Sequence, residues 1–320
     1  MGHQPGAVAK RGSNSGCSAI QSGTLAYMSL YPKDSTDGVL RLGNIVPDFE
    51  ADTTKGHMRF HKWKQGKWAI LFSHPADFTP VCTTEIASLA TKYAELVDMD
   101  CKVATLSVDP VTAHDEWLKD VIAQHTDGKI SIDFPIIADP NRDISTAYGM
   151  IDPWSSDRQD LPLTIRCVFI INPENKLMLS LNYPACVGRN MTEIVRCVKA
   201  LQLSYQKSVA TPANWPDNHS EVVMPDGTTS KEYKGSVFLL PTVTDKEADK
   251  YYPGYYTSPV PSEIPYLRLV KPEQVGLAPT NKKGVETKSG KEKHYGAFSW
   301  FSKKNTSKHR MKVNAVKAAA

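Results

Sequence analysis

One cysteine, Cys82, lies between prolyl and threonyl neighbours in the stretch HPADFTPVCTTE. The thiolate is the nucleophilic form of cysteine, and the unpaired amide groups and dipole of a helix N-terminus stabilise it. Thr79 precedes Cys82 by three residues, so its hydroxyl can point at the sulfur or at a bound oxygen. The pattern is typical of a reactive thiol. A buried structural cysteine at a helix start is the alternative, and position alone favours neither.

The residues on either side of Cys82 predict the elements that position it. The apolar run WAILF, Trp68 to Phe72, is followed by Pro75 and is typical of a buried strand. From Glu85 to Val97, apolar residues recur at helical spacing. Cys82 is therefore predicted at a strand-to-helix turn, on or near the first turn of the helix.

Strand and helix patterns continue to alternate along the chain. The predicted strands are residues 102–109, 135–139, 166–171 and 176–183, and the predicted helices are residues 113–124 and 191–207. The turn NPEN joins the last two strands into a hairpin. This order of elements predicts an α/β layer fold.

Composition divides the chain into four parts. Residues 1–38 are rich in Gly and Ser and are expected to be a disordered extension, whereas residues 39–207 form the main α/β domain. Prolines interrupt residues 208–275, which predicts a small C-terminal domain with short strands in 235–241 and 266–270. Residues 276–320 are a low-complexity basic tail.

Cysteine usage and charge limit the function classes. None of the six cysteines forms a CxxC pair, which argues against a zinc ribbon or a thioredoxin-type dithiol. No stretch has the length of a membrane span, and we expect a reducing, cytoplasmic setting.

The whole chain carries a net charge of +4, but residues 281–320 hold eleven basic and two acidic side chains, a net charge of +9. The tail could therefore contact nucleic acid or another anionic surface, or act as a nuclear signal. A solvated tail is the favoured alternative, and the acid-free N-terminus weakly resembles a mitochondrial transit peptide.

The stretch around Cys82 resembles the peroxiredoxin signature P-x-x-x-T-x-x-C, here Pro75, Thr79 and Cys82. Flanking stretches resemble the 1-Cys subfamily over residues 39–270, in the same order along the chain. These stretches are LFSHPADFTPVCTTE, LPLTIRCVFI, YPACVGRN, LQLSYQKSVATPANW and a late LPT. The resemblance implies a thioredoxin-like fold with an added C-terminal domain, and a homodimer. It also implies reduction of hydrogen peroxide and organic hydroperoxides, with no metal or organic cofactor.

The resemblance assigns roles to six residues in particular. Cys82 would be the peroxidatic nucleophile, Thr79 would hydrogen-bond the sulfur and the peroxide, and Pro75, helped by Pro80, would shape the turn. His74 would be the histidine at the pocket mouth, and Glu85 would be the acid that orients Arg166.

The chemistry of these side chains agrees with such a role. Arg166 is always cationic, so it can stabilise the thiolate and the negative charge on the leaving oxygen. The product would be a sulfenic acid on Cys82. The structural alternatives are a surface charge for Arg166 and a hydrogen-bonded core histidine for His74. His57 and His61, on one face of a probable strand, are interpreted as structural.

A 1-Cys cycle needs an external thiol, such as glutathione or a thioredoxin-like protein. No cysteine follows Cys197, and Cys186 is expected in a loop too far from Cys82 for a disulfide. The remaining alternatives are a redox-controlled chaperone or sensor that uses Cys82, and an anionic-surface binder driven by the tail. Some mammalian relatives are credited with a phospholipase activity at a G-x-S-x-G-like site. Here Lys67 replaces its serine and Glu174 its aspartate, although His61 matches its histidine, so that activity is not expected.

Overall fold

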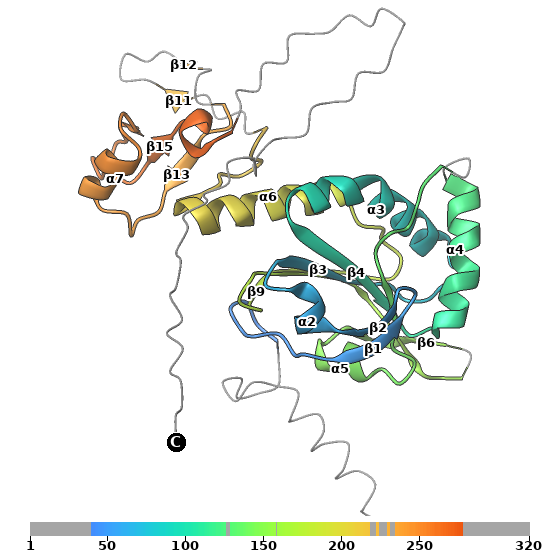
Figure 1. Cartoon of the computed structure of the whole chain (residues 1–320). Helices are drawn as coiled ribbons and strands as arrows, with labels where there is room; N and C mark the ends of the chain where they lie inside the picture. Colours follow the sequence, from blue (N-terminus) through green and yellow to red (C-terminus); the bar gives the residue numbers. More distant parts are fainter. Residues whose placement is uncertain are drawn as a thin grey trace, which may run out of the picture. The chain divides into compact units, whose positions relative to one another are not determined.

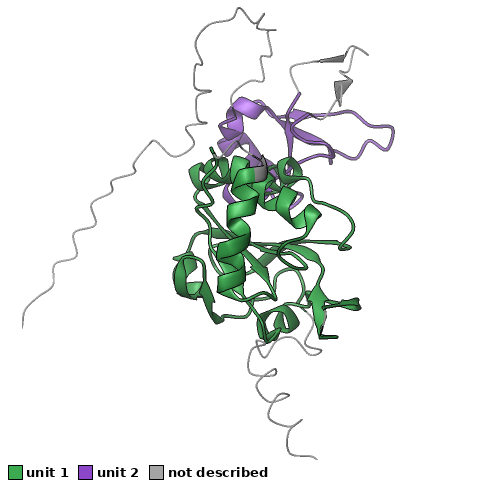
Figure 2. Cartoon of the chain, turned by 90° about the vertical axis from the view of Figure 1, so that its right-hand side faces the viewer, with its two compact units in different colours: residues 1–198 green, residues 199–320 purple. Residues whose placement is uncertain are grey.

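The structure, a computed structural model, describes residues 40–125, 129–157, 159–217, 222–223, 229–230 and 234–277. The extension predicted for residues 1–38 and nearly all of the predicted basic tail lie outside these residues. The chain forms two compact units, Met1–Val198 and Lys199–Ala320 (Figure 2). The boundary falls within helix α6 (Met191–Lys207), whereas the sequence places a domain boundary after residue 207. The four-part division of the chain stays a prediction.

A seven-stranded mixed sheet forms the centre of the first unit (Figure 1). Its order is β2 (Gly56–Arg59), β1 (Glu50–Thr53), β5 (Ile136–Ala138), β4 (Cys101–Ser107), β3 (Trp68–Ser73), β8 (Arg166–Ile171) and β9 (Leu177–Tyr183). β3 pairs with β4, and β4 with β5, in parallel, while the other neighbours are antiparallel. The predicted strands around β3, β4, β5, β8 and β9 are therefore present, with small shifts at their ends.

Helices cover both faces of this sheet. α3 (Pro80–Asp98) and α4 (Val111–His125) lie on one face, and α2 (Phe60–Lys64) and α5 (Asp143–Ala147) lie on the other (Figure 1). All six residues of β3 are buried, as expected for a strand covered on both sides. Ala69 and Leu71 join the core beneath α2 and α5. Because side chains alternate along a strand, Ile70 and Phe72 face α3 and α4 instead.

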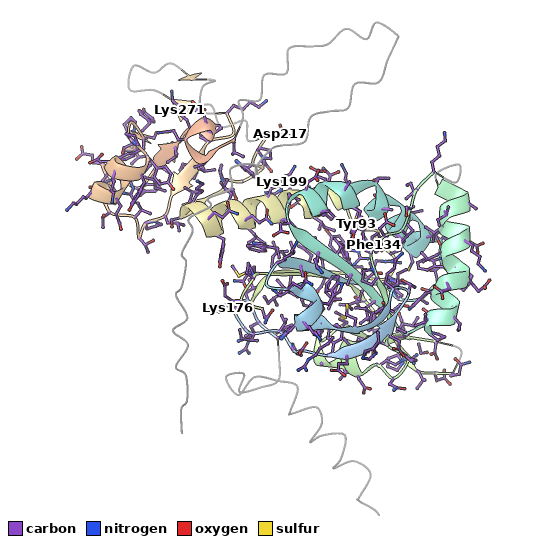
Figure 3. All side chains as sticks on the ribbon, in the orientation of Figure 1. Tyr93, Phe134, Lys176, Lys199, Asp217 and Lys271 are labelled. Carbon is purple, nitrogen blue, oxygen red and sulfur yellow. The ribbon has the colours of Figure 1, made fainter. Side chains whose placement is uncertain are left out.

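Aromatic side chains also fix α3 at the edge of the first unit. Tyr93 of α3 packs against Phe134, which precedes β5, with ring centroids 5.5 Å apart (Figure 3).

Within the described residues, no helix combines the length and apolar composition that a membrane span requires.

The segment with His57 and His61 differs from the sequence prediction of a single strand. β2 ends at Arg59, and the short helix α2 begins at Phe60. The Asp48 carboxylate accepts a hydrogen bond from the backbone N–H of His61 at 2.8 Å. It thereby caps the new helix from a distant part of the chain, an interaction that local periodicity does not reveal. His57 stays in β2 and contacts Asp52.

The second unit has its own small core. A four-stranded sheet runs in the order β10 (Val209–Ala210), β13 (Val237–Leu239), β15 (Arg268–Val270) and β14 (Tyr256–Thr257). α7 (Asp245–Tyr251) begins with a capping box formed by Thr244 and Glu247. Trp215, Leu239 and Val270 are among the apolar residues buried together. The short strands predicted in 235–241 and 266–270 correspond to β13 and β15.

Candidate active site

Cys82 lies in the first turn of α3, as its third residue, and its side chain is fully buried. Thr79 is the N-cap in an extended conformation, and Pro80 opens the helix, where the missing N–H of proline costs nothing. The first-turn amide groups of an α-helix have no intrahelical acceptor. The turn therefore places the sulfur at the positive end of a helix of 19 residues.

Arg166, the first residue of β8, reaches this sulfur. Its Nη1 lies 3.2 Å from Cys82 Sγ, and the side chain is 3% exposed. Nε and Nη2 both donate to the carbonyl oxygen of Ala185, at 2.8 and 2.6 Å. Because β8 lies beside β3 in the sheet, the arginine approaches from the strand next to the one that leads to Cys82. The guanidinium is thus fixed on one side by a carbonyl and meets the sulfur on the other.

Glu85, one turn after Cys82, binds two arginines. Its carboxylate accepts from Arg166 Nη1 at 2.9 Å and from Arg189 Nη2 at 2.8 Å. Burial alone would raise the pKa of Glu85, but the hydrogen bonds and charge of Arg189, together with the charge of Arg166, lower it. Among the described side chains of this cluster, two cations face one carboxylate. A thiolate on Cys82 would balance the remaining positive charge.

Arg189 is a site residue that the sequence prediction did not include. It also donates to the carbonyl oxygens of Ser73 and Cys167, at 2.8 and 2.6 Å, and so joins the ends of β3 and β8. Its guanidinium lies over the Phe72 ring, 5.2 Å from the centroid. The available signal was an arginine directly after a glycine, ahead of a predicted helix, in YPACVGRN.

The structure brings Cys82, Glu85 and Arg166 together, whereas Thr79 and His74 bond within the preceding turn. The Thr79 hydroxyl donates to the Ala76 carbonyl at 3.0 Å rather than to the sulfur. His74 is 1% exposed and contacts the Asp77 carboxylate through Nε2 at 2.9 Å. This is the arrangement of the structural alternative for His74, not of a residue at a pocket mouth. Pro75, which follows His74 in the chain, is buried.

Comparison with known proteins identifies the family of this chain. The AhpC/TSA family matches residues 42–180. Peroxiredoxin-6 of Homo sapiens is 43% identical over 233 residues, which cover 72% of this chain and 97% of that protein. The chain belongs to the peroxiredoxin family. Peroxiredoxin-6 of Gallus gallus is 44% identical over 231 residues, covering 72% of this chain and 96% of that protein.

Two solved peroxiredoxin structures are similar over a comparable share of the chain. A cysteine-to-serine mutant of Peroxiredoxin 6 of Arenicola marina is 39% identical, with a TM-score of 0.64, covering 72% of this chain and 98% of that one. A yeast mitochondrial 1-Cys peroxiredoxin is 35% identical, with a TM-score of 0.61, covering 73% and 100%. The predicted thioredoxin-like fold and 1-Cys class are confirmed. The protein is a thiol-dependent peroxidase.

The other four cysteines that the structure describes differ from Cys82 in their surroundings. Burial raises the pKa of Cys101 far above its usual range and that of Cys167 to about 11. Burial and the neighbouring Glu193 raise the pKa of Cys197 to about 11. These three thiols are therefore poor nucleophiles at neutral pH. Cys186 is an exposed free thiol, directly after the Ala185 carbonyl that holds Arg166.

The residues at the phospholipase-like positions make other contacts. The Lys67 ammonium lies 2.6 Å from the Asp100 carboxylate. Glu174 accepts a hydrogen bond from the side chain of Asn172 at 2.6 Å. His61 lies against Asp48, with 3.9 Å between its Nδ1 and the carboxylate. In the described parts of the chain, no group of three or more His, Cys, Asp or Glu side chains is placed to hold a metal ion.

Proposed function

We propose that Cys82 is the peroxidatic nucleophile and that Arg166 is its electrostatic partner. The observation that carries this assignment is the 3.2 Å contact between Arg166 Nη1 and a buried sulfur at a helix N-terminus. A guanidinium here stabilises the thiolate, because hydrogen bonds to charged groups are stronger than neutral ones. Glu85 and Arg189 hold the guanidinium in place through a buried ion-pair network.

The reaction that this geometry supports is an in-line displacement at oxygen. The Cys82 thiolate attacks one peroxide oxygen, the O–O bond breaks, and the other oxygen leaves with the bonding electrons and takes up a proton. The products are a sulfenic acid on Cys82 and water or an alcohol. The positive charge of Arg166 opposes the negative charge that develops on the leaving oxygen. Thr79 and Pro75 shape the turn that precedes Cys82. His74 supports the same turn through its hydrogen bond with Asp77.

Apolar side chains beside the site favour organic hydroperoxides as well as hydrogen peroxide. Phe78, next to Thr79, is 58% exposed, and Val187 is 44% exposed. A Cβ at Gly188 would lie 3.4 Å from Val81 Cγ1, so the loop carrying Val187 lies against the first turn of α3. An alkyl group can pack on such a rim. Phe78→Ser should slow the reaction with an alkyl hydroperoxide more than the reaction with hydrogen peroxide; equal effects on both would contradict this.

The sulfenic acid is reduced by an external thiol in this proposal. The yeast relative of 1-Cys type is described as using glutathione and thioredoxin systems for thiol resolution. Two thiol equivalents would return Cys82 to the thiol, with one disulfide and one water as products. Cys186 is exposed. That it lies too far from Cys82 to act as a resolving cysteine stays a prediction.

We further propose a homodimer that forms through β9, and a cytoplasmic location. β9 is an edge strand of the sheet, and beyond Leu177 no described strand pairs with its outer side. Such an edge is a template for pairing with a second copy. Sedimentation velocity should give a dimer, and a concentration-independent monomer would contradict this.

Cell fractionation tests the proposed cytoplasmic location, with nuclear or mitochondrial recovery as the contrary result.

Peroxide consumption with glutathione or with a thioredoxin system tests the enzymatic proposal. Wild type and Cys186→Ser should turn over with at least one donor, and Cys82→Ser should not. Disulfide mapping after one equivalent of peroxide should show no dominant Cys82–Cys186 bond. Such a bond, together with loss of turnover in Cys186→Ser, would instead show an intramolecular resolving cysteine.

A further inference from the structure

Two buried imidazoles share one carboxylate in the turn that leads to Cys82. Asp77 Oδ1 lies 2.9 Å from His74 Nε2, and Asp77 Oδ2 lies 2.6 Å from His114 Nδ1. The exposed fractions of the three side chains are 0–1%. His114 comes from α4, whereas Asp77 and His74 belong to residues 74–79, between β3 and α3. This group is outside the contacts that hold Arg166.

The two imidazole rings have different hydrogen-bond partners. His114 Nδ1 faces the carboxylate, and its Nε2 lies 3.3 Å from the carbonyl oxygen of Ile137. Both partners are acceptors, so both nitrogens must donate, and only the imidazolium can do so. His74 donates from Nε2, and its Nδ1 is buried without a hydrogen-bond partner in the described structure. The partners therefore point to two donating nitrogens on His114, facing the Asp77 carboxylate and the Ile137 carbonyl, and to one on His74.

The charge pair stabilises an ionised Asp77 deep in the protein. Burial alone would raise the pKa of Asp77, but the hydrogen bonds from His114 and His74 lower it. The backbone N–H of Asp77 is held separately by the Asp109 carboxylate at 2.9 Å. Asp77 is thus fixed at its backbone and at both carboxylate oxygens.

α4 makes a second contact on the other side of the same turn. Trp117 Nε1 donates to Thr83 Oγ1 at 3.0 Å, and the Thr83 hydroxyl donates to the Thr79 carbonyl at 2.8 Å. His114 and Trp117 are three residues apart and lie on one face of the helix. α4 therefore holds the chain at Asp77, before Cys82, and at Thr83, directly after it.

The held segment contains a strained residue. Phe78 has a φ of 53°, in the left-handed region, and its side chain is 58% exposed. A non-glycine residue in this region is strained and persists only where its surroundings impose the conformation. Because the Phe78 side chain is mostly exposed, we attribute this conformation to its neighbours Asp77 and Thr79, which are held by hydrogen bonds.

We propose that His114 is a positioning residue for the peroxidase reaction. Its imidazolium fixes Asp77, and Asp77 in turn fixes the strained turn. This turn positions Thr79 and the first turn of α3 around Cys82. This inference rests on the proposed role of Cys82. His114 does not touch the sulfur, so its effect is on the geometry of the reacting groups. A small displacement of such groups lowers the rate with peroxide.

Two substitutions separate the two hydrogen bonds of His114. His114→Asn keeps a side-chain N–H near the position of Nδ1, toward Asp77, whereas His114→Gln keeps one near Nε2, toward Ile137. We expect the second-order rate constant with hydrogen peroxide to fall by about tenfold to about a hundredfold in His114→Gln and by much less in His114→Asn. His61→Gln, at a partly buried histidine of the same unit that lies against Asp48 instead, is the control and should react like wild type.

Nitrogen-15 NMR of the histidine rings provides a readout that loss of packing would not mimic. In the folded wild type near neutral pH, both ring nitrogens of His114 should carry protons, and only Nε2 of His74 should. Asp77→Asn should remove the second proton from His114 and lower the rate as His114→Gln does. This variant and the wild-type spectrum keep the test decisive if His114→Gln does not fold.

A neutral His114 ring, equal losses in the Asn and Gln variants, or a wild-type rate in His114→Gln would overturn the proposal. Failure of the proposed function would be recognised differently. In that case the wild-type protein itself would react with peroxide without using Cys82, whatever the state of His114.

Discussion

Replacement of Arg166 should slow peroxide reduction far more than removal of a comparable arginine elsewhere. Arg166→Met removes the 3.2 Å contact with Cys82 Sγ and leaves Glu85 bound to Arg189. A hydrogen bond to a charged group is worth about 1.5–3 kcal/mol. Because about 1.4 kcal/mol corresponds to a factor of ten, the second-order rate constant should fall by about tenfold to about 150-fold. Arg166→Lys keeps a cation but cannot bind Cys82, Glu85 and Ala185 together, so it should also be slower than wild type.

Stopped-flow mixing of each reduced variant with hydrogen peroxide measures this rate constant directly. Arg196→Met is the matched control, since Arg196 makes a 2.6 Å ion pair with Glu193 on α6 and has no described contact with Cys82. Thermal unfolding and far-UV circular dichroism confirm that each variant is folded at the assay temperature. A folded Arg166→Met protein that reacts within about threefold of wild type would refute the electrostatic role, since that loss corresponds to less than 1 kcal/mol.

Three further predictions concern the site network and the parts of the chain around it. Glu85 has a lowered pKa in the folded protein, so its contribution to stability is present above its unfolded value of 4.5 and is lost as the pH falls through the folded pKa. Glu85→Gln should flatten that acid dependence and lower the unfolding free energy at neutral pH by about 3–5 kcal/mol, because two buried guanidinium groups lose their carboxylate. Urea titrations from pH 7 to pH 3 measure the pH dependence and the unfolding free energy. Unchanged stability would argue against a buried ion-pair network. Phospholipid vesicles should release no fatty acid above a heat-inactivated control, because Lys67 binds Asp100 and offers no hydroxyl nucleophile; release that co-purifies with the protein would contradict this. Truncation after Leu277, which packs against the core of the second unit, should leave the peroxidase rate unchanged and weaken any salt-sensitive binding to polyanions. Loss of the rate would instead show that the tail supports the fold.

Local patterns were sufficient for the elements that carry Cys82 and Arg166. The run WAILF predicted β3, and the bounds expected for β8 and α6 agree with the structure. These segments are regular, and their apolar periodicity reflects burial on a sheet or a helix face. The place of Cys82 in the first turn of α3 follows from the same local reasoning.

Long-range contacts explain what the sequence did not reveal. Arg189 joins the site only because the loop before α6 returns to the ends of β3 and β8. His114 of α4 meets Asp77, which is 37 positions earlier in the sequence. The strand expected through His61 fails because the Asp48 carboxylate caps α2 from outside the segment. Each of these is a polar contact between distant parts of the chain, and apolar periodicity carries no information about such contacts.

The measurement that tests the central claim most directly is the site of oxidation in a single turnover. Reduced protein is mixed with one equivalent of hydrogen peroxide, quenched with a sulfenic-acid trap, and analysed by peptide mass spectrometry. The account predicts that the trap labels Cys82 alone, in step with peroxide loss, and that Cys82→Ser neither consumes peroxide nor takes up the label. Peroxide consumption by Cys82→Ser at the wild-type rate, or first labelling at another cysteine, would contradict it.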